Sequence, residues 1–200
     1  MPKIIDANKK LDRNKKKDPK ISLLSYNYSQ MSKISSAKKR LDRNKKLDLE
    51  ISSLVRRSVI NIKYHQFDVA NYKDFISNKM AIRSVIQYGL PSSVFTLIRT
   101  TVPFSEGDWS SLLGLSTKTL KRYKTDGRQF KPLQSEKIIE MAEVAHMGVD
   151  TFGNLDRFKL WLASPNYALG NISPLELLKD SYGKEMVISE LTRINHGILV

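Results

Sequence analysis

From Tyr72 onward, apolar residues recur at intervals of three and four, which is the spacing of helices with one buried side. One such stripe predicts a helix from Tyr72 to Tyr88, ended by Gly89. A second helix is expected to begin at Leu90-Pro91-Ser92 and to stop before Pro103. The pattern therefore predicts an all-α fold.

Two short helices joined by a glycine are predicted next. Ser105, with Asp108 three residues later, matches a capping box, and the helix that it opens ends at Gly114. Ser116 caps a second helix, TKTLKRYK, which ends near Lys124. The apolar spacing is that of a helix-turn-helix, with its positions at Trp109, Leu113, Leu115, Leu120 and Tyr123 and a small residue, Ser110, where the helices approach.

The polar side of that second helix offers hydroxyls for base edges and cations for phosphates or guanine, which favours DNA binding. The alternative is that any two short helices joined by glycine match this pattern and that the lysines only solubilise it. The candidate DNA contacts are Ser116, Thr117, Lys118, Thr119, Lys121, Arg122, Lys124 and Arg128, with Lys131 on a flanking phosphate.

A rigid corner is predicted after the next apolar stripe. The helix that carries Trp161 must stop before Pro165, which lacks a backbone donor. Asn166 and Gly170 suit the turn, and Ser173-Pro174 has the form of an N-cap followed by proline at the first helical position. Ordinary helix-loop-helix packing would also explain this stretch.

The amino-acid sequence of the corner resembles that of the C-terminal domain shared by the ParS, MbcA and Xre antitoxins. That pattern runs tryptophan-leucine, proline-asparagine, alanine-leucine-glycine, then serine-proline and a leucine-rich helix. The chain matches it at Trp161, Leu162, Pro165, Asn166, Ala168, Leu169, Gly170, Ser173, Pro174, Leu175, Leu177 and Leu178, and residues 193–198 are similar to the family's closing arginine-isoleucine-glutamate-histidine-glycine-valine. The resemblance extends back through the helix-turn-helix and covers about the last 130 residues.

The resemblance implies an antitoxin that represses its own operon and silences a partner toxin with a RES domain, an enzyme that destroys NAD. The expected mechanism is steric, with the chain's tail closing the toxin's active site. Lys118 and Lys121 replace arginines of the family's second helix, and lysine cannot form a bidentate fork to guanine, so we expect an operator preference that is either altered or weaker. The implied toxin contacts are Trp161, Pro165, Asn166, Leu169, Gly170, Arg193, His196, Gly197, Ile198, Leu199 and Val200.

Positive charge is concentrated in two places. Of the net +14, residues 1–66 supply +12 (18 Lys/Arg, 6 Asp/Glu) and residues 114–132 supply +5 (6 Lys/Arg, 1 Asp). The first segment contains a duplication, because Lys9–Leu24 recurs as Lys39–Leu54. We expect a solvated, partly disordered arm, either binding DNA phosphates or without a partner, whose Leu47, Ile51, Leu54 and Val55 line one side of a short helix.

The expected organisation is a basic arm at 1–66, an Xre-like helix-turn-helix domain at 67–134 and a toxin-binding domain at 135–200. A homodimer reading two half-sites of double-stranded operator DNA is expected, paired through the helix from Tyr72 to Tyr88. The alternatives left open are a repressor without a toxin and an RNA-binding accessory protein that uses the arm. Translation from Met31 would remove one copy of the repeat.

Catalysis and metal binding are not expected. The chain has no cysteine, and its three histidines lack a second ligand at metal spacing. Glu140 and Glu143 share a helix without a nucleophile or phosphate loop, so a solvated helix side accounts for them. With no apolar run of membrane length, we expect a cytoplasmic protein with no enzyme activity, no cofactor and no membrane partner.

Overall fold

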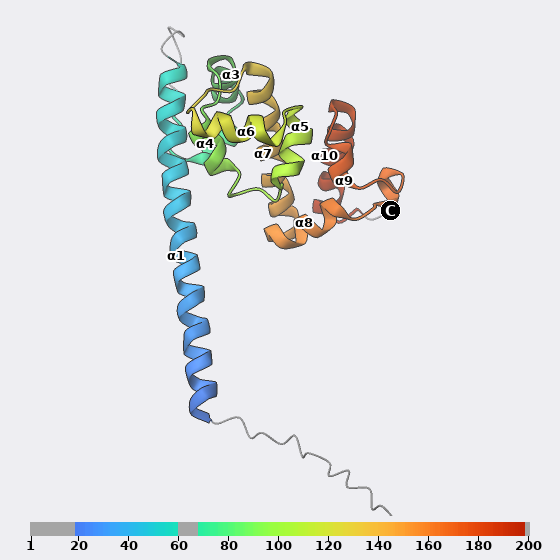
Figure 1. Ribbon diagram of the computed structural model, residues 1–200. Coiled ribbons are helices and arrows are strands. Elements are labelled where there is room, and N and C mark those ends of the chain that lie inside the picture. Colours follow the sequence, from blue (N-terminus) through green and yellow to red (C-terminus); the bar gives the residue numbers. More distant parts are fainter. Residues whose placement is uncertain (1–18, 60–67, 199–200) are drawn as a thin grey trace, which may run out of the picture. The chain divides into compact units, whose positions relative to one another are not determined.

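The computed structural model describes residues 19–59 and 68–198, with side chains from residue 29 onward. Its elements are helices throughout these ranges, which confirms the all-α prediction (Figure 1). They are α1 (Pro19–Ser58), α2 (Tyr72–Ser77), α3 (Lys79–Tyr88), α4 (Ser92–Ile98), α5 (Glu106–Leu113), α6 (Thr117–Thr125), α7 (Pro132–Phe152), α8 (Leu155–Ala163), the 3₁₀ turn η1 (Tyr167–Leu169), α9 (Pro174–Leu177) and α10 (Ser181–Asn195).

Helix α7 is the centre of the core. It packs against α2, α3 and α5 and also against α8 and α10, so that it lies between the two sets in Figure 1. Proline fits its first turn, where backbone N–H groups have no helical partner, and Gly153 ends it in a left-handed conformation. The side chains that α7 buries are mostly aliphatic: Ile138, Ile139, Met141, Ala142, Val144 and Ala145.

The chain divides into two compact units between Asp42 and Arg43, inside α1. In the second unit, the apolar side of α1 is buried as the sequence predicted, with Leu47, Ile51, Leu54 and Val55 between 0% and 2% exposed. The expected low order before residue 66 differs from the structure over residues 19–58, which form one helix. From Leu47 onward, the apolar side of this helix has a core to pack on. Residues 1–18 and 60–66 lie outside the described residues.

The single helix expected from Tyr72 to Tyr88 is wrong. Asn78 ends α2 and begins α3, and its side-chain oxygen accepts a hydrogen bond from Ala81 N at 3.0 Å. Phe75 and Ile82 point into the core, whereas Met80 is 46% exposed. The apolar side expected to pair with a second copy is therefore covered by the chain's own helices.

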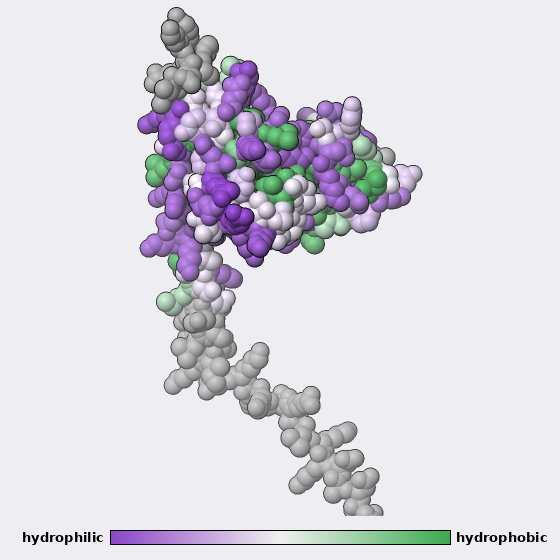
Figure 2. Space-filling model, turned by 45° about the horizontal axis from the view of Figure 1, so that its top comes forward, coloured by the Kyte–Doolittle hydropathy of each residue, from purple (hydrophilic) through white to green (hydrophobic). Residues whose placement is uncertain are grey.

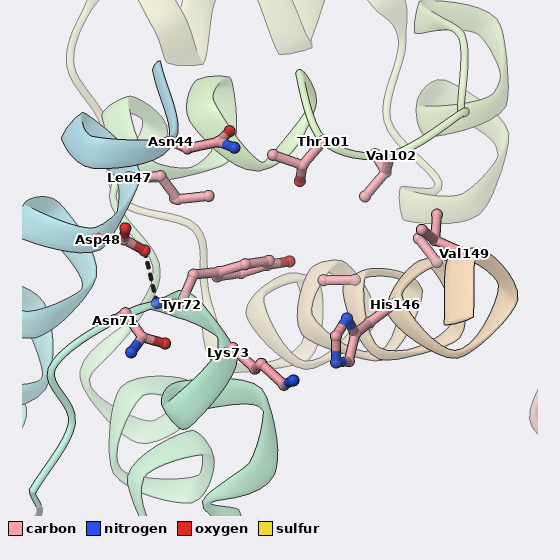
Figure 3. Close-up of a pocket in the computed structure, with 12 residues that line it drawn as sticks. Asn44, Leu47, Asp48, Asn71, Tyr72, Lys73, Thr101, Val102, His146 and Val149 are labelled. Atoms are coloured by element: carbon pink, nitrogen blue, oxygen red, sulfur yellow. Dashed lines mark hydrogen bonds between the residues drawn. The ribbon is translucent and has the colours of Figure 1, made fainter. Parts of the chain in front are cut away.

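A cavity of about 360 Å³ lies where α1, α2, the segment after α4 and α7 meet (Figure 3). Asp48 of α1 accepts a hydrogen bond from Tyr72 N at 2.9 Å, which joins α1 to α2. The Tyr72 side chain extends from α2 towards α7, and its hydroxyl is buried without a hydrogen-bond partner among the described residues. Burial raises the pKa of Tyr72 well above its ordinary value near 10.

Two glycines allow neighbouring helices to approach closely. A Cβ atom on Gly148 of α7 would lie 2.2 Å from a ring carbon of Phe158 in α8. A Cβ atom on Gly183 of α10 would lie 2.1 Å from the carbonyl oxygen of Leu177 in α9. Neither distance is possible for a real side chain, so the packing of the last three helices depends on these two positions.

Gly183→Ala should lower the free energy of unfolding by roughly 1–3 kcal/mol, because the added methyl group must displace the backbone of α9. Gly107→Ala is the matched control, since a Cβ there meets only Ser105 Oγ at 3.7 Å and alanine favours the helix. Urea denaturation of both variants measures the difference. Equal stabilities would contradict the close approach of α9 and α10.

Tyr72→Phe should protect the fold at high pH. The raised pKa means that the unfolded chain loses the phenol proton first, so that the stability of the native protein falls as pH rises beyond about 10. At neutral pH the variant should differ by less than about 1 kcal/mol, since the hydroxyl has no hydrogen bond of good geometry and its one polar neighbour, Thr101, lowers the pKa of Tyr72 less than burial raises it. The test is denaturation of the unaltered protein and both variants at neutral pH and above about pH 10. Tyr88→Phe is the control, because it alters an exposed tyrosine. If Tyr72→Phe lost as much stability at alkaline pH as the unaltered protein does, the prediction would be wrong.

Candidate functional sites

The helix-turn-helix is built by the caps that the sequence predicted. Ser105 Oγ accepts a hydrogen bond from Asp108 N at 3.1 Å, and Asp108 Oδ2 accepts one from Ser105 N at 2.7 Å, which completes the capping box. Gly114 takes a φ of +61° at the turn. Ser116 Oγ accepts from Thr119 N at 3.1 Å and starts α6.

Aromatic packing fixes the angle between these helices and the core. Trp109 is fully buried and meets Phe95 edge-on, with ring centroids 5.1 Å apart. Tyr123 of α6 stacks on Phe130 at 4.6 Å. Ser110 Oγ donates to the carbonyl oxygen of Leu115 at the point where α5 and α6 approach. The helix α6 is thus held by one side and leaves the other in solvent.

The exposed side of α6 carries most of the candidate DNA contacts. Thr117, Lys118, Lys121, Arg122 and Lys124 are all exposed. The hydroxyls of Ser116 and Thr119 lie 2.9 Å from each other, so these two candidate contacts form a hydrogen bond with each other at the N-cap of α6.

Two of the cations expected to bind DNA are paired with acids of the chain. Arg128 lies 2.8 Å from Asp126, and Lys121 Nζ lies 3.8 Å from Glu106. The basic surface is therefore partly neutralised before any ligand arrives.

The corner after α8 has the predicted turn devices. Asn166 Oδ1 accepts a hydrogen bond from Ala168 N at 2.9 Å, and Gly170 has a φ of +71°. Asn166 N donates to the carbonyl oxygen of Ile172 at 3.2 Å and closes the loop. Ser173 then caps α9, with Pro174 in its first turn, as the sequence indicated. The corner is fixed by its own backbone.

The corner divides its candidate toxin contacts between core and surface. Leu169 is 3% exposed, so it anchors the corner and is not available as a contact. Trp161 is half-buried and lies 5.4 Å from Phe152 and 6.0 Å from Phe158, between ring centroids. Pro165 and Gly170 are exposed, whereas Asn166 is half-buried.

The end of α10 presents the remaining candidates. His196 and Gly197 are exposed, and Gly197 has a φ of +70°. Ile198 N donates to the carbonyl oxygen of Arg193 at 2.9 Å, so a glycine turn directs the 53%-exposed Ile198. Arg193 is half-buried and lies 3.6 Å from Glu190. The candidates Leu199 and Val200 lie outside the described residues.

Several exposed apolar side chains of this region were missed at the level of sequence. Tyr167 and Tyr182 are 80% and 83% exposed, and Leu160 is 70% exposed. Hydrophobic surface is visible among the C-terminal elements at the right of Figure 2. The position of Tyr167, between the turn residues Asn166 and Gly170, is the one sequence signal that could have identified it.

The sequence suggested that Glu140 and Glu143 are simply solvated, but both are paired with lysines in the structure. Glu140 accepts a hydrogen bond from Lys184 and lies 3.9 Å from Lys137, while Glu143 pairs with Lys79. Burial, followed by the nearby Lys184 cation, lowers the pKa of Lys137, although Glu140 opposes this. These contacts tie α10 and α3 to α7.

His146 is half-buried, with Nε2 3.6 Å from Asp150. Within residues 29–59 and 68–198, the side chains form no cluster of three potential metal ligands. Among the helices that the structure describes, none has the length and apolar character needed to cross a membrane.

Comparison with known proteins identifies two domains in the chain. Residues 82–143 match the antitoxin Xre-like helix-turn-helix domain, and residues 147–197 match the antitoxin Xre/MbcA/ParS C-terminal toxin-binding domain. The chain is 26% identical over 119 residues to an antitoxin Xre of Photorhabdus laumondii, covering 59% of this chain and 80% of that protein. An antitoxin Xre of Yersinia enterocolitica is 29% identical over 115 residues, covering 56% and 77%.

The two matched domains meet inside α7, and the helix-turn-helix and the corner described above fall one in each. The domain boundary expected between residues 134 and 135 falls in the first turn of the same helix. An Xre-like helix-turn-helix followed by a toxin-binding domain makes the chain a member of the Xre/MbcA/ParS antitoxin family.

Proposed function

We propose that this antitoxin blocks the active site of a RES-domain toxin that degrades NAD and represses its own operon through α6. The observation that carries the toxin half of the proposal is the exposed Ile198, directed by the Gly197 turn at the end of the toxin-binding domain. The RES class of the partner rests on the family resemblance of the corner and of residues 193–198. The antitoxin itself holds no NAD in this mechanism.

The proposed toxin surface combines the corner with the end of α10. Exposed apolar side chains at a fixed position lose little conformational freedom on binding and bury hydrophobic area, which suits them to act as anchors. Leu169 acts from inside, by holding the corner. The proposed contacts are Trp161, Pro165, Asn166, Gly170, Arg193, His196, Gly197, Ile198, Leu199 and Val200, to which we add Tyr167.

The proposed operator surface is the exposed side of α6 with its flanking cations. Lys118 and Lys121 supply charge to phosphates, and Arg122 is the side chain able to fork to guanine. Ser116 and Thr119 stabilise the start of the helix, and the start of a recognition helix lies close to the bases. The other proposed contacts are Thr117, Lys124, Arg128 and Lys131.

We also propose a homodimer, because helix-turn-helix proteins ordinarily read two half-sites related by symmetry. Its interface is a surface other than the apolar sides of α2 and α3, which the core occupies.

The combined Lys118→Ala and Arg122→Ala variant should bind operator DNA more weakly by at least tenfold, because it loses two cationic contacts. Its slope of log affinity against log salt should be shallower by about 1.8. Titration of the full chain on its promoter fragment between about 50 and 200 mM salt measures both quantities. Lys159→Ala with Arg157→Ala is the control, since these exposed cations of α8 lie outside the helix-turn-helix. Equal losses in both double variants would contradict the assignment of α6.

Expression of a RES-domain toxin encoded beside this gene should arrest growth, and co-expression of this chain should restore growth and the cellular level of NAD. Ile198→Asp should abolish the rescue, because a charge would have to enter the toxin's pocket without a partner. Met80→Asp, another exposed apolar position outside the matched toxin-binding domain, should retain it. Rescue by Ile198→Asp would remove the tail from the mechanism, and an absence of toxicity would favour a repressor without a toxin.

A further inference from the structure

The acidic side chain of Glu106 lies in the basic surface proposed to bind DNA. It is the first residue of α5, and its Oε1 atom lies 3.8 Å from Lys121 Nζ on α6. Its Oε2 atom lies 3.9 Å from Arg99 Nη2, at the end of α4. One carboxylate therefore faces cations of two helices.

The position of this carboxylate is constrained. Oε1 is buried and has no hydrogen-bond partner among the described residues. Arg99 is itself placed over the face of Phe95, with its guanidinium carbon 5.7 Å from the ring centroid. Lys121, in contrast, is 74% exposed and ends in solvent. The geometry holds Glu106 beside a lysine that is free to move to a phosphate.

A phosphate that approaches Lys121 must compete with Glu106. A phosphate in contact with Lys121 would lie within the screening length of the Glu106 carboxylate, which is about 8–10 Å in physiological salt, so the two negative groups would repel each other. When Lys121 turns to DNA, Glu106 loses one of its two cations. Every DNA sequence meets this cost, because phosphates carry no sequence information.

We infer that Glu106 limits the sequence-independent affinity of this antitoxin for DNA by competing for Lys121. The inference rests on the proposed DNA-binding function of α6. Base contacts made by the neighbouring side chains are unaffected by this competition, so Glu106 lowers the affinity for every duplex by a similar factor and leaves the preference for particular bases to those contacts. An acid at a helix start also stabilises the helix dipole, but that role predicts no effect on DNA.

The test is the binding of full-length Glu106→Gln to a short duplex of arbitrary sequence. Its affinity should rise by about two- to fivefold, the size of an exposed ion-pair effect. The dependence on salt should steepen by about 0.9, because Lys121 then neutralises a phosphate without releasing a carboxylate. The steeper salt slope is the readout that a purely structural role of Glu106 would not produce.

Glu176→Gln is the matched control. Glu176 also lies in the first turn of a helix, at 4.0 Å from Lys179, and the variant gains the same unit of positive charge away from α6. It should bind as the unaltered protein does. An equal increase in both variants, or none in Glu106→Gln, would overturn the inference.

Adding Lys121→Gln tests whether Glu106 acts by competing for Lys121 or only through its own negative charge. In that background the gain from Glu106→Gln should be clearly smaller, since the cation for which it competes is gone and only the direct repulsion between carboxylate and phosphate remains. An undiminished gain would overturn the competition for Lys121. If the unaltered protein bound no duplex DNA, or bound it independently of Arg122, the proposed operator function would fail first, and this outcome is distinct from a failure of Glu106 alone.

Discussion

The burial of α7 on both of its sides is the constraint on which the rest of the structure depends. The helix covers α3 and α5 on one side and α8 and α10 on the other. Both matched domains draw on it, since the first ends at residue 143 and the second begins at residue 147 within the same helix. No separate core exists within the described residues for either domain, because one contiguous cluster of buried side chains runs through both.

Elements that depend on local chemistry could be predicted from the sequence. The capping box at Ser105 and Asp108, the reversal at Gly114 and the turn at Asn166 all form from residues a few positions apart. Such devices carry their own energetics, so they need no knowledge of the remaining fold. The family resemblance is specific for the same reason, because the residues that carry it lie at such turns.

Features that depend on distant contacts could not be predicted in the same way. The break at Asn78 interrupts an apolar pattern that a continuous helix would satisfy equally well. Gly183 matters only because α9 passes beside it, and Leu169 was assigned to a surface although the core holds it. The stretch of α1 after residue 42 is ordered by a partner surface that its basic composition does not reveal. In each case, tertiary packing decided what local spacing left open.

The absence of a hinge within α7 has a consequence for the protein's lifetime in the cell. Proteases usually cut at exposed loop tips, and helices usually bend at an interior proline or glycine. Between its terminal turns α7 has no proline and only the buried Gly148. Opening either half for degradation exposes core that the other half shares. Under the proposed function, removal of this chain would release the toxin and the promoter together, so that neither activity could outlast the other as a stable fragment.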